Sequence, residues 1–122
     1  MLIDTNLIIY AVHPAYHELR HWLIGQLPAY SVISRVESLG FHRLTVEDRN
    51  SIEAVLDALD RLYLSTETFD LAIRLRQQRK MSLGDSLIAA TALEHHLTLA
   101  TANVDDFLWV DGLTVTNPLK QS

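Results

Sequence analysis

The sequence predicts an α/β protein of three layers, α/β/α, built around a central, mainly parallel five-stranded sheet. Three observations support this fold. Short apolar runs typical of buried strands alternate with segments of helical periodicity, the pattern of a parallel sheet with helices on both faces. The helical segment 85–94 is almost uncharged, which predicts burial on most sides. The chain has no repeat, low-complexity stretch or linker, so residues 1–122 are expected to form a single domain.

The elements follow from local pattern. The expected strands are short runs rich in apolar and β-branched residues, and they cover residues 1–3, 30–33, 62–65, 97–100 and 113–116. The expected helices carry apolar residues three or four positions apart, and they cover residues 7–12, 16–27, 34–44, 47–60, 66–80 and 85–94. Pro14 and Pro28 mark breaks after the first and second helices.

Composition limits the class of protein. With 48% hydrophobic and 20% charged residues, the chain has the balance of a soluble globular domain. The absence of cysteine excludes a disulfide framework and a thiolate metal site. No run approaches the roughly 18 apolar residues of a membrane span, and Asp4 is the first charged residue, so no basic secretory leader is expected. These features predict a cytoplasmic protein with no membrane contact.

The charge distribution is uneven. A net charge of −5 argues against simple electrostatic binding of nucleic acid over the whole surface. One basic run, formed by Arg74, Arg76, Arg79 and Lys80, stands out against this background. Such a run is either a solvated helix face or a binding surface for a polyanion. An acidic protein can still bind phosphate where bound metal neutralises part of its negative charge.

Acidic residues recur beside the predicted strands. Asp4 directly follows the first strand, and Glu37 lies at the start of the helix after the second. Asp85 opens the buried helix that precedes the fourth strand, and Asp105 and Asp106 come after that strand. Because the carboxyl ends of parallel strands meet at one edge of a sheet, we expect these carboxylates to converge there.

A cluster of this kind predicts a particular chemistry. Carboxylates that converge without a counter-charge repel one another, which raises their pKa values and costs stability. A hard divalent cation with oxygen ligands, Mg²⁺ or Mn²⁺, is the simplest partner. A cation bound in this way can polarise a phosphodiester and activate water for attack on phosphorus. The cluster therefore predicts a metal-dependent nuclease.

Each acidic position also has a local explanation, because Asp, Asn and Ser are favourable helix N-caps. Asp4 and Asn103 could cap the helices that follow them, and Ser34-x-x-Glu37 and Ser82-x-x-Asp85 have the spacing of capping boxes, with Gly84 as a turn residue. Separate caps would be independent of one another, whereas one shared site accounts for all the positions together.

The motifs resemble those of a known family. Leu2-Ile-Asp-Thr-Asn6, Ser34-x-x-Glu37, Leu83-Gly-Asp-Ser-Leu-Ile-Ala-Ala-Thr-Ala92 and Thr101-Ala-Asn-Val-Asp-Asp-Phe107 occur in this order. Their identity and separation resemble the PIN domain and, within it, the VapC-type toxins of toxin–antitoxin pairs. The resemblance covers essentially the whole chain. The first, third and fourth motifs are specific in combination, whereas the second is weak alone.

The resemblance implies a metal-dependent endoribonuclease toxin with a PIN-type α/β/α fold. The catalytic residues and ligands of Mg²⁺ or Mn²⁺ would be Asp4, Glu37, Asp85 and Asp106. Asp105, beside Asp106, leaves the identity of the fourth ligand open. Residues in supporting roles around the carboxylates and the loop after the fourth strand would be Thr5, Asn6, Ser34, Ser86, Thr101 and Asn103.

The resemblance also implies partners. These are an RNA substrate, a cognate VapB-type antitoxin that inhibits the enzyme, a second copy in a homodimer, and operator DNA only through the antitoxin. The basic run Arg74, Arg76, Arg79 and Lys80 would then contact RNA or the antitoxin. The alternative is a PIN-like binding module that acts through the antitoxin and operator and cuts nothing. The presence of all four carboxylates argues against it.

Two further features are expected to be structural. His13, His17 and His21 are spaced by four residues, but Pro14 interrupts a helical metal stripe, so surface positions are predicted. The tryptophans, at positions 22 and 109, are expected to serve packing or an interface rather than base stacking.

Overall fold

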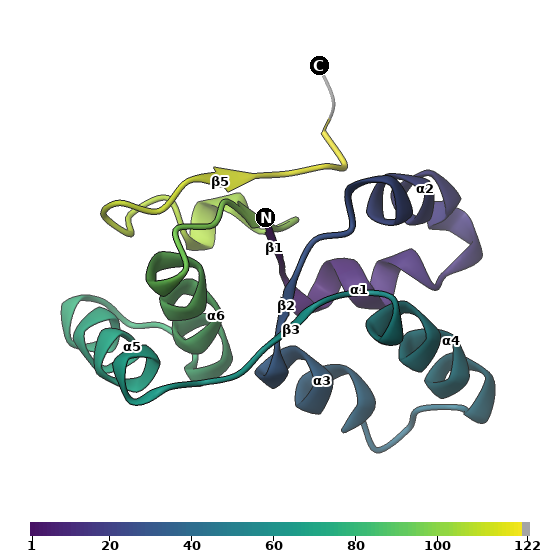
Figure 1. Cartoon of the computed structure of the whole chain (residues 1–122), viewed down its shortest axis with the longest axis horizontal. Coiled ribbons are helices and arrows are strands. Elements are labelled where there is room, and N and C mark those ends of the chain that lie inside the picture. Colours follow the sequence, from purple (N-terminus) through teal and green to yellow (C-terminus); the bar gives the residue numbers. More distant parts are fainter. Residues whose placement is uncertain (121–122) are drawn as a thin grey trace.

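Five short strands alternate with six α-helices along residues 1–120, the part of the chain that the computed structural model describes (Figure 1). The strands are β1 (Leu2–Ile3), β2 (Tyr30–Ser31), β3 (Arg61–Leu62), β4 (Leu99–Ala100) and β5 (Val115–Thr116). The helices are α1 (Thr5–Ala11), α2 (His17–Gln26), α3 (Val32–Leu39), α4 (Val46–Asp57), α5 (Thr66–Gln78) and α6 (Leu83–Glu94), with 3₁₀ turns η1 (Pro14–Tyr16) and η2 (Val104–Asp106). No helix within these residues is long and apolar enough to cross a membrane.

The strands run in the order β3-β2-β1-β4-β5, and all neighbouring pairs are parallel. Ladder hydrogen bonds group β1, β4 and β5 in one sheet and β2 and β3 in another. A bridge between Leu2 and Ala29 joins the two, and the Ile3 N–H donates to the Ala29 carbonyl at 2.9 Å. The predicted parallel arrangement is confirmed, although the ladder is divided into two parts that meet at β1 and β2.

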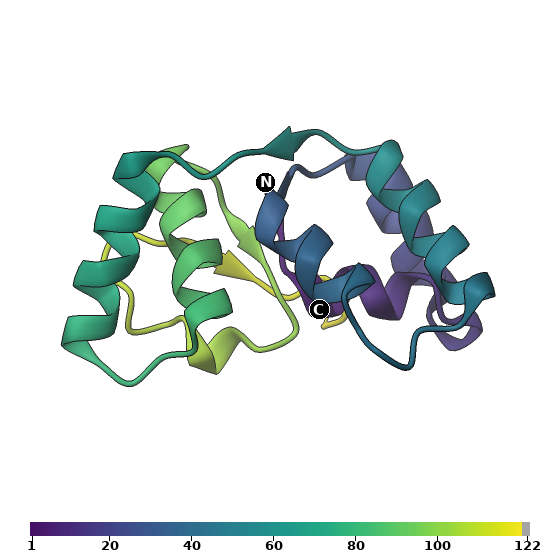
Figure 2. The same cartoon turned by 90° about the horizontal axis from the view of Figure 1, so that it is seen from below.

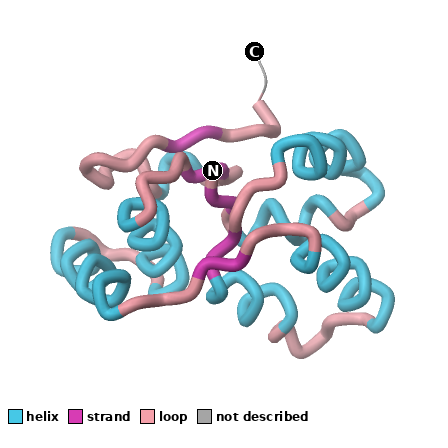
Figure 3. The backbone as a smooth tube through the Cα atoms, viewed as in Figure 1, coloured by secondary structure: helices cyan, strands magenta, loops and turns pink. Residues whose placement is uncertain are grey.

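Helices cover both faces of the strands, which confirms the three layers. Successive strand residues point to opposite faces. Leu2 and Leu99 pack with α5 and α6, whereas Ile3 and Ala100 pack with α1, α2 and α4. Figures 1 and 2 show these two groups of helices on opposite sides, and Figure 3 shows the strands as short central segments between them. Residues 86–92 of α6 are all buried, as their lack of charge predicts.

Each of the first two strands is shorter than predicted, because a helix begins at its end. Asp4 is the N-cap of α1, and Ser31 is the N-cap of α3, with its hydroxyl accepting a hydrogen bond from the Ile33 N–H at 3.4 Å. The predicted start of this helix at Ser34 and its extension to residue 44 are therefore wrong. The residue that directly follows each of these strands therefore lies at the edge of the sheet.

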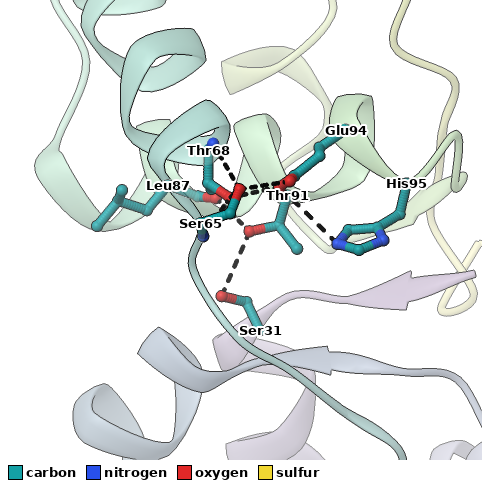
Figure 4. Close-up of polar contacts among 7 residues, drawn as sticks. All are labelled: Ser31, Ser65, Thr68, Leu87, Thr91, Glu94 and His95. Atoms are coloured by element: carbon teal, nitrogen blue, oxygen red, sulfur yellow. Dashed lines mark hydrogen bonds and ion pairs between the residues drawn. The ribbon is translucent and has the colours of Figure 1, made fainter.

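Helices α5 and α6 pack more extensively than any other pair of elements. Ser65 caps α5, and Thr68 completes a capping box with it. The Ser65 hydroxyl donates to Glu94 Oε1 at 2.5 Å, and the Thr68 hydroxyl donates to the other carboxylate oxygen of Glu94 (Figure 4). These bonds connect the first turn of α5 to the last turn of α6. The opposite end of the pair, where α5 ends and α6 begins, faces the carboxylates described next.

Candidate active site

Asp4 is the buried residue of the predicted cluster, and it follows β1 at the end where β1 and β4 lie side by side. Its Oδ1 accepts the Thr5 N–H at 2.7 Å, which makes it a helix cap as the local explanation requires. Its Oδ2 accepts the Thr101 hydroxyl at 2.6 Å from the residue that follows β4. Capping and site formation are therefore not exclusive at this position. Thr101 fixes the carboxylate across two strands that are far apart in sequence.

Glu37 approaches Asp4 through Thr5. The Thr5 hydroxyl lies 2.7 Å from Glu37 Oε1 and 2.8 Å from Ser34 Oγ. Because a carboxylate can only accept, the Thr5 proton goes to Glu37. Since Ser31 caps α3, Ser34 is a buried residue of the first turn and Glu37 lies in the second. The capping-box explanation of Ser34 and Glu37 is wrong, and the expected place of Glu37 in the first turn is corrected.

Asp85 enters the same region from the first turn of α6. Ser82 caps this helix, and its hydroxyl accepts the Asp85 N–H at 3.1 Å. Gly84 lies directly against the Glu37 carboxylate, so that a methyl group added at Gly84 would overlap Glu37 Oε2. The predicted turn role of Gly84 is therefore replaced by a close approach between α6 and α3. A side chain at position 84 would have to displace the Glu37 carboxylate.

The loop after β4 supplies the fourth acid. Asp106 ends η2, and its N–H donates to the Asn103 carbonyl at 3.0 Å. The negative charge of Asp106 helps to raise the pKa values of both Asp4 and Asp85, whereas Asp105 affects neither. Asp106 thus faces the other carboxylates more directly than its neighbour. Asn103 makes no side-chain capping bond, but its N–H donates to the Thr101 hydroxyl at 3.0 Å.

The electrostatics follow from burial and like charge. Burial raises the pKa of Asp4, the hydrogen bonds from Thr101 and Thr5 oppose the rise, and the charges of Glu37 and Asp106 add to it. Burial likewise raises the pKa of Asp85, with a further contribution from Asp4 and Asp106 and an opposing one from the Ser82 hydroxyl. Within residues 1–120, no Lys or Arg lies within ion-pair distance of any carboxylate. The cluster is therefore uncompensated negative charge.

A cleft of about 640 Å³ opens beside the cluster. Its lining residues are Arg76, Arg79, Lys80, Met81, Ser82, Asp85, Asp105, Asp106 and Trp109. The lining therefore combines a basic part, formed by Arg76, Arg79 and Lys80, with an acidic part, formed by Asp85, Asp105 and Asp106. Of the predicted basic run, Arg74 alone is absent from the lining and is exposed elsewhere on α5.

The remaining predicted residues differ in their positions. Ser86 is buried, and its hydroxyl donates to the Leu83 carbonyl at 2.7 Å, so it serves the backbone of α6. Asn6 is exposed in α1. His13, His17 and His21 are exposed, as predicted for surface residues. Trp109 was expected to serve packing or an interface; it packs against the hydrophobic core beside α6 and also lines the cleft. The sequence feature that could have indicated a place in the cleft is the position of Trp109 three residues after Asp106. In the structure, its indole N–H donates to the Asp106 carbonyl at 2.9 Å.

The donor set suits a hard cation, although the residues do not form a closed cage. Within residues 1–120, no three His, Asp or Glu side chains are grouped closely enough to hold a metal ion by themselves. Mg²⁺ usually binds through one or two carboxylates and keeps several waters, so it needs no such cage. The uncompensated charge and the all-oxygen donors of Asp4, Glu37, Asp85 and Asp106 fit this mode.

Comparison with known proteins gives the family. The sequence model of the PIN domain matches residues 1–113. The chain belongs to the PIN domain family. No curated protein matches it. The PIN fold explains why the acidic motifs, spread over the whole chain, meet at one sheet edge.

Solved structures share this PIN fold over nearly the whole chain. A toxin–antitoxin complex from Klebsiella pneumoniae is 28% identical, covers 96% of each chain and gives a TM-score of 0.77. FitAcB from Neisseria gonorrhoeae is 25% identical, covers 98% of this chain and 99% of the other, and gives 0.80. DNA-bound VapBC from Salmonella typhimurium is 17% identical, covers 95% of this chain and 96% of the other, and gives a TM-score of 0.81. At this identity the likeness is one of fold.

Proposed function

We propose that this PIN domain is a metal-dependent endoribonuclease, the toxin of a toxin–antitoxin pair. The observation that carries the proposal is the pair Asp4 and Asp85, whose charge burial and the nearby charges of Glu37 and Asp106 make costly, with no Lys or Arg within ion-pair distance. A protein retains such a cluster at a cost in stability, which is expected where a bound cation is part of the activity.

Asp4 and Asp85 would hold the cation, with Glu37 and Asp106 completing the oxygen ligands. A bound Mg²⁺ or Mn²⁺ polarises a phosphodiester and makes water an effective nucleophile at neutral pH. Thr101 and the Thr5 N–H keep the Asp4 carboxylate oriented, and the Thr5 hydroxyl does the same for Glu37. The four proposed ligands thus come from four separate elements, and Asp4 and Glu37 are positioned before substrate arrives.

Water is the nucleophile in this proposal. The cleft is lined by no histidine, and the chain contains no cysteine, so neither a Ser–His pair nor a thiolate is available there. The oxygen of water forms a bond to phosphorus while the bond to the leaving ribose oxygen breaks. The proton lost by the water passes to a carboxylate of the cluster or to solvent.

The proposed partners follow from what similar proteins are found with. A relative from Klebsiella pneumoniae is described as a toxin–antitoxin complex, and VapBC2 from Rickettsia felis is bound to a fragment of promoter DNA. For this chain we propose a cognate VapB-type antitoxin, a homodimer, and contact with operator DNA only through the antitoxin. These partners imply a cytoplasmic site of action.

The test is cleavage of labelled total RNA by the purified full-length protein with Mg²⁺, with Mn²⁺ and with chelator. Asp4→Asn keeps the shape of the side chain and its hydrogen bond to the Thr5 N–H, so the variant should fold. Discrete fragments that need metal and disappear in Asp4→Asn support the proposal. Asp57→Asn, an exposed position at the end of α4, is the matched control and should cleave as the wild type does.

Equal cleavage by wild type and Asp4→Asn, or none by the wild type with either metal, contradicts the proposal. The second result favours the alternative, a binding module that acts through the antitoxin and operator.

A further inference from the structure

We propose that Arg79, held by Trp109, is the residue of the cleft that binds the backbone phosphate of single-stranded RNA. This inference deepens the proposed function and rests on it for the identity of the ligand. The geometry behind it is independent of the metal, because it concerns the basic part of the cleft. It assigns separate roles to cationic residues that the sequence presents as one run.

The position of each cation separates the basic run. Arg76, Arg79 and Lys80 line the cleft together with Asp85 and Asp106, whereas Arg74 does not. None of these cations has a carboxylate within ion-pair distance, since the contact between Glu94 and His95 is the only one among residues 1–120. The positive charge in this part of the cleft is therefore free to bind an anion.

Arg79 differs from its basic neighbours in being held by an aromatic ring from a distant part of the chain. It is the C-cap of α5 with an extended backbone, so its side chain leaves the helix axis. Its guanidinium carbon lies 5.2 Å from the centre of the Trp109 ring, a cation–π contact. Arg76 instead donates its Nε–H to the Met81 carbonyl at 3.2 Å, which uses one of its donors locally.

Trp109 links this guanidinium to the acidic part of the cleft. The indole N–H donates to the Asp106 carbonyl at 2.9 Å, and the ring carries Arg79. The distance between Arg79 and the loop that presents Asp106 is thus set by one rigid ring. A planar guanidinium so held can donate two parallel hydrogen bonds to a phosphate with little further loss of side-chain entropy.

The cleft, with its basic and acidic parts, favours a nucleic-acid strand over an acidic peptide. A nucleic-acid strand carries several phosphates, so one can lie at the metal-binding carboxylates while another contacts Arg79 in the same cleft. A peptide carboxylate near Arg79 would also lie near Asp105 and Asp106, which repel it. A single carboxylate has no second anionic group to place at the metal-binding carboxylates, as an RNA strand has. Trp109 acts here as a positioning residue, because Arg79 lies over its ring.

The experiment measures binding of a short, fluorescein-labelled single-stranded RNA of mixed sequence to the full-length protein in chelator. Fluorescence anisotropy is recorded over a series of salt concentrations. Arg79→Ala should weaken binding about tenfold, the effect of losing hydrogen bonds to a charged group. It should also reduce the slope of log K against log salt by about 0.7, the value for one phosphate contact on a single strand. Arg49→Ala, an exposed arginine of α4, is the charge-matched control, and Arg74→Ala should have a smaller effect than Arg79→Ala.

The role of Trp109 is tested by coupling. Trp109→Ala should weaken RNA binding several-fold in the wild type but add almost nothing in Arg79→Ala, because the two residues act as one unit. A merely structural role would give additive losses. In Trp22→Phe, where Trp109 is the single tryptophan, RNA should change the indole emission, and Arg79→Ala should abolish that change.

Failure of this inference can be distinguished from failure of the proposed function. Metal-dependent cleavage by the wild type, with Arg79→Ala binding and cleaving equally well, overturns the role of Arg79 and leaves the nuclease intact. Binding that depends on Arg79 without any cleavage by the wild type supports the phosphate contact and contradicts the nuclease. As a further probe, labelled poly-glutamate is titrated against the same proteins. If Arg79→Ala binds RNA as the wild type does but loses affinity for poly-glutamate, Arg79 binds an acidic peptide and the proposal is overturned.

Discussion

The two ends of the α5–α6 pair hold carboxylates in opposite situations. At one end, the hydroxyls of Ser65 and Thr68 donate to Glu94 and lower its pKa (Figure 4). At the other end, burial and the charges of Asp4 and Asp106 raise the pKa of Asp85. Glu94 is thus satisfied by the fold itself, whereas Asp85 lacks a compensating charge within it. The same side-chain chemistry serves stability at one end and is left available for a ligand at the other.

The largest expected effect is at the uncompensated end. Asp85→Asn should reduce metal-dependent RNA cleavage by at least on the order of a hundredfold, because a ligand carboxylate of the cation is lost. In chelator, its thermal unfolding temperature should equal or exceed that of the wild type, since a half-buried charge has been removed. Differential scanning fluorimetry measures the unfolding temperature, and a cleavage assay with labelled RNA measures the loss of activity. A clear loss of stability in chelator would contradict the comparison.

A second substitution sharpens the same end without changing any charge. Gly84→Ala should displace the Glu37 carboxylate, because the new methyl group overlaps it. Glu37 is exposed and can rotate away, so the free energy of unfolding should change by less than about 1 kcal/mol, the helix propensity difference between Gly and Ala. Cleavage should fall about tenfold, the lower range for a residue that positions a ligand.

Gly25→Ala is the control for this experiment, because a methyl group on that residue of α2 meets no neighbouring atom within 4 Å. It should leave cleavage unchanged. Normal cleavage by Gly84→Ala would show that the approach between Gly84 and Glu37 has no part in activity.

The satisfied end should respond in the opposite way. Glu94→Gln should lower the free energy of unfolding by about 1–2 kcal/mol, because charge-assisted hydrogen bonds from Ser65 and Thr68 are replaced by weaker neutral ones. RNA cleavage at a temperature where the variant is folded should be unchanged. Urea unfolding measures the loss, with Glu53→Gln in the middle of α4 as the control. Equal stability of the two variants would mean that the bonds at Glu94 contribute nothing.

The smallest expected effect is the pH dependence of that loss. Because the pKa of Glu94 is lowered on folding, its ionised form contributes stability that is fully present above the ordinary glutamate value of about 4.3. This contribution disappears as the pH falls through the lowered pKa of the folded protein. The difference in unfolding free energy between wild type and Glu94→Gln should therefore shrink toward acid pH. A difference that stays constant or grows on acidification would contradict the sign of the shift.

Several features of the site could be predicted from local sequence. An apolar triplet followed by Asp4 predicts a buried strand with a carboxylate at its end, and Thr101 occupies the matching place after β4. The alternation of strands and helices predicts that these ends share an edge. These inferences succeed because strand burial and parallel order depend on hydrophobic patterns that are read along the chain.

Other features depended on contacts between elements that are distant in sequence. Pattern could not choose Ser31 over Ser34 as the cap of α3, since both are good caps and the choice depends on where packing ends β2. Asp105 and Asp106 are chemically identical neighbours, and only the path of the loop after β4 brings the charge of the second close enough to raise the pKa values of Asp4 and Asp85. Gly84 looks like a turn residue until α3 brings Glu37 against it.

The basic run shows the same division. The sequence by itself determined the fold class, the acidic positions and the presence of cations beside Asp85. Only the tertiary structure separated Arg79 from Arg74 and placed Trp109 between Arg79 and Asp106. The physical reason is that burial repeats every second residue in a strand and every third or fourth residue in a helix, so it can be recognised locally. The direction that one polar side chain faces is decided by the element packed against it.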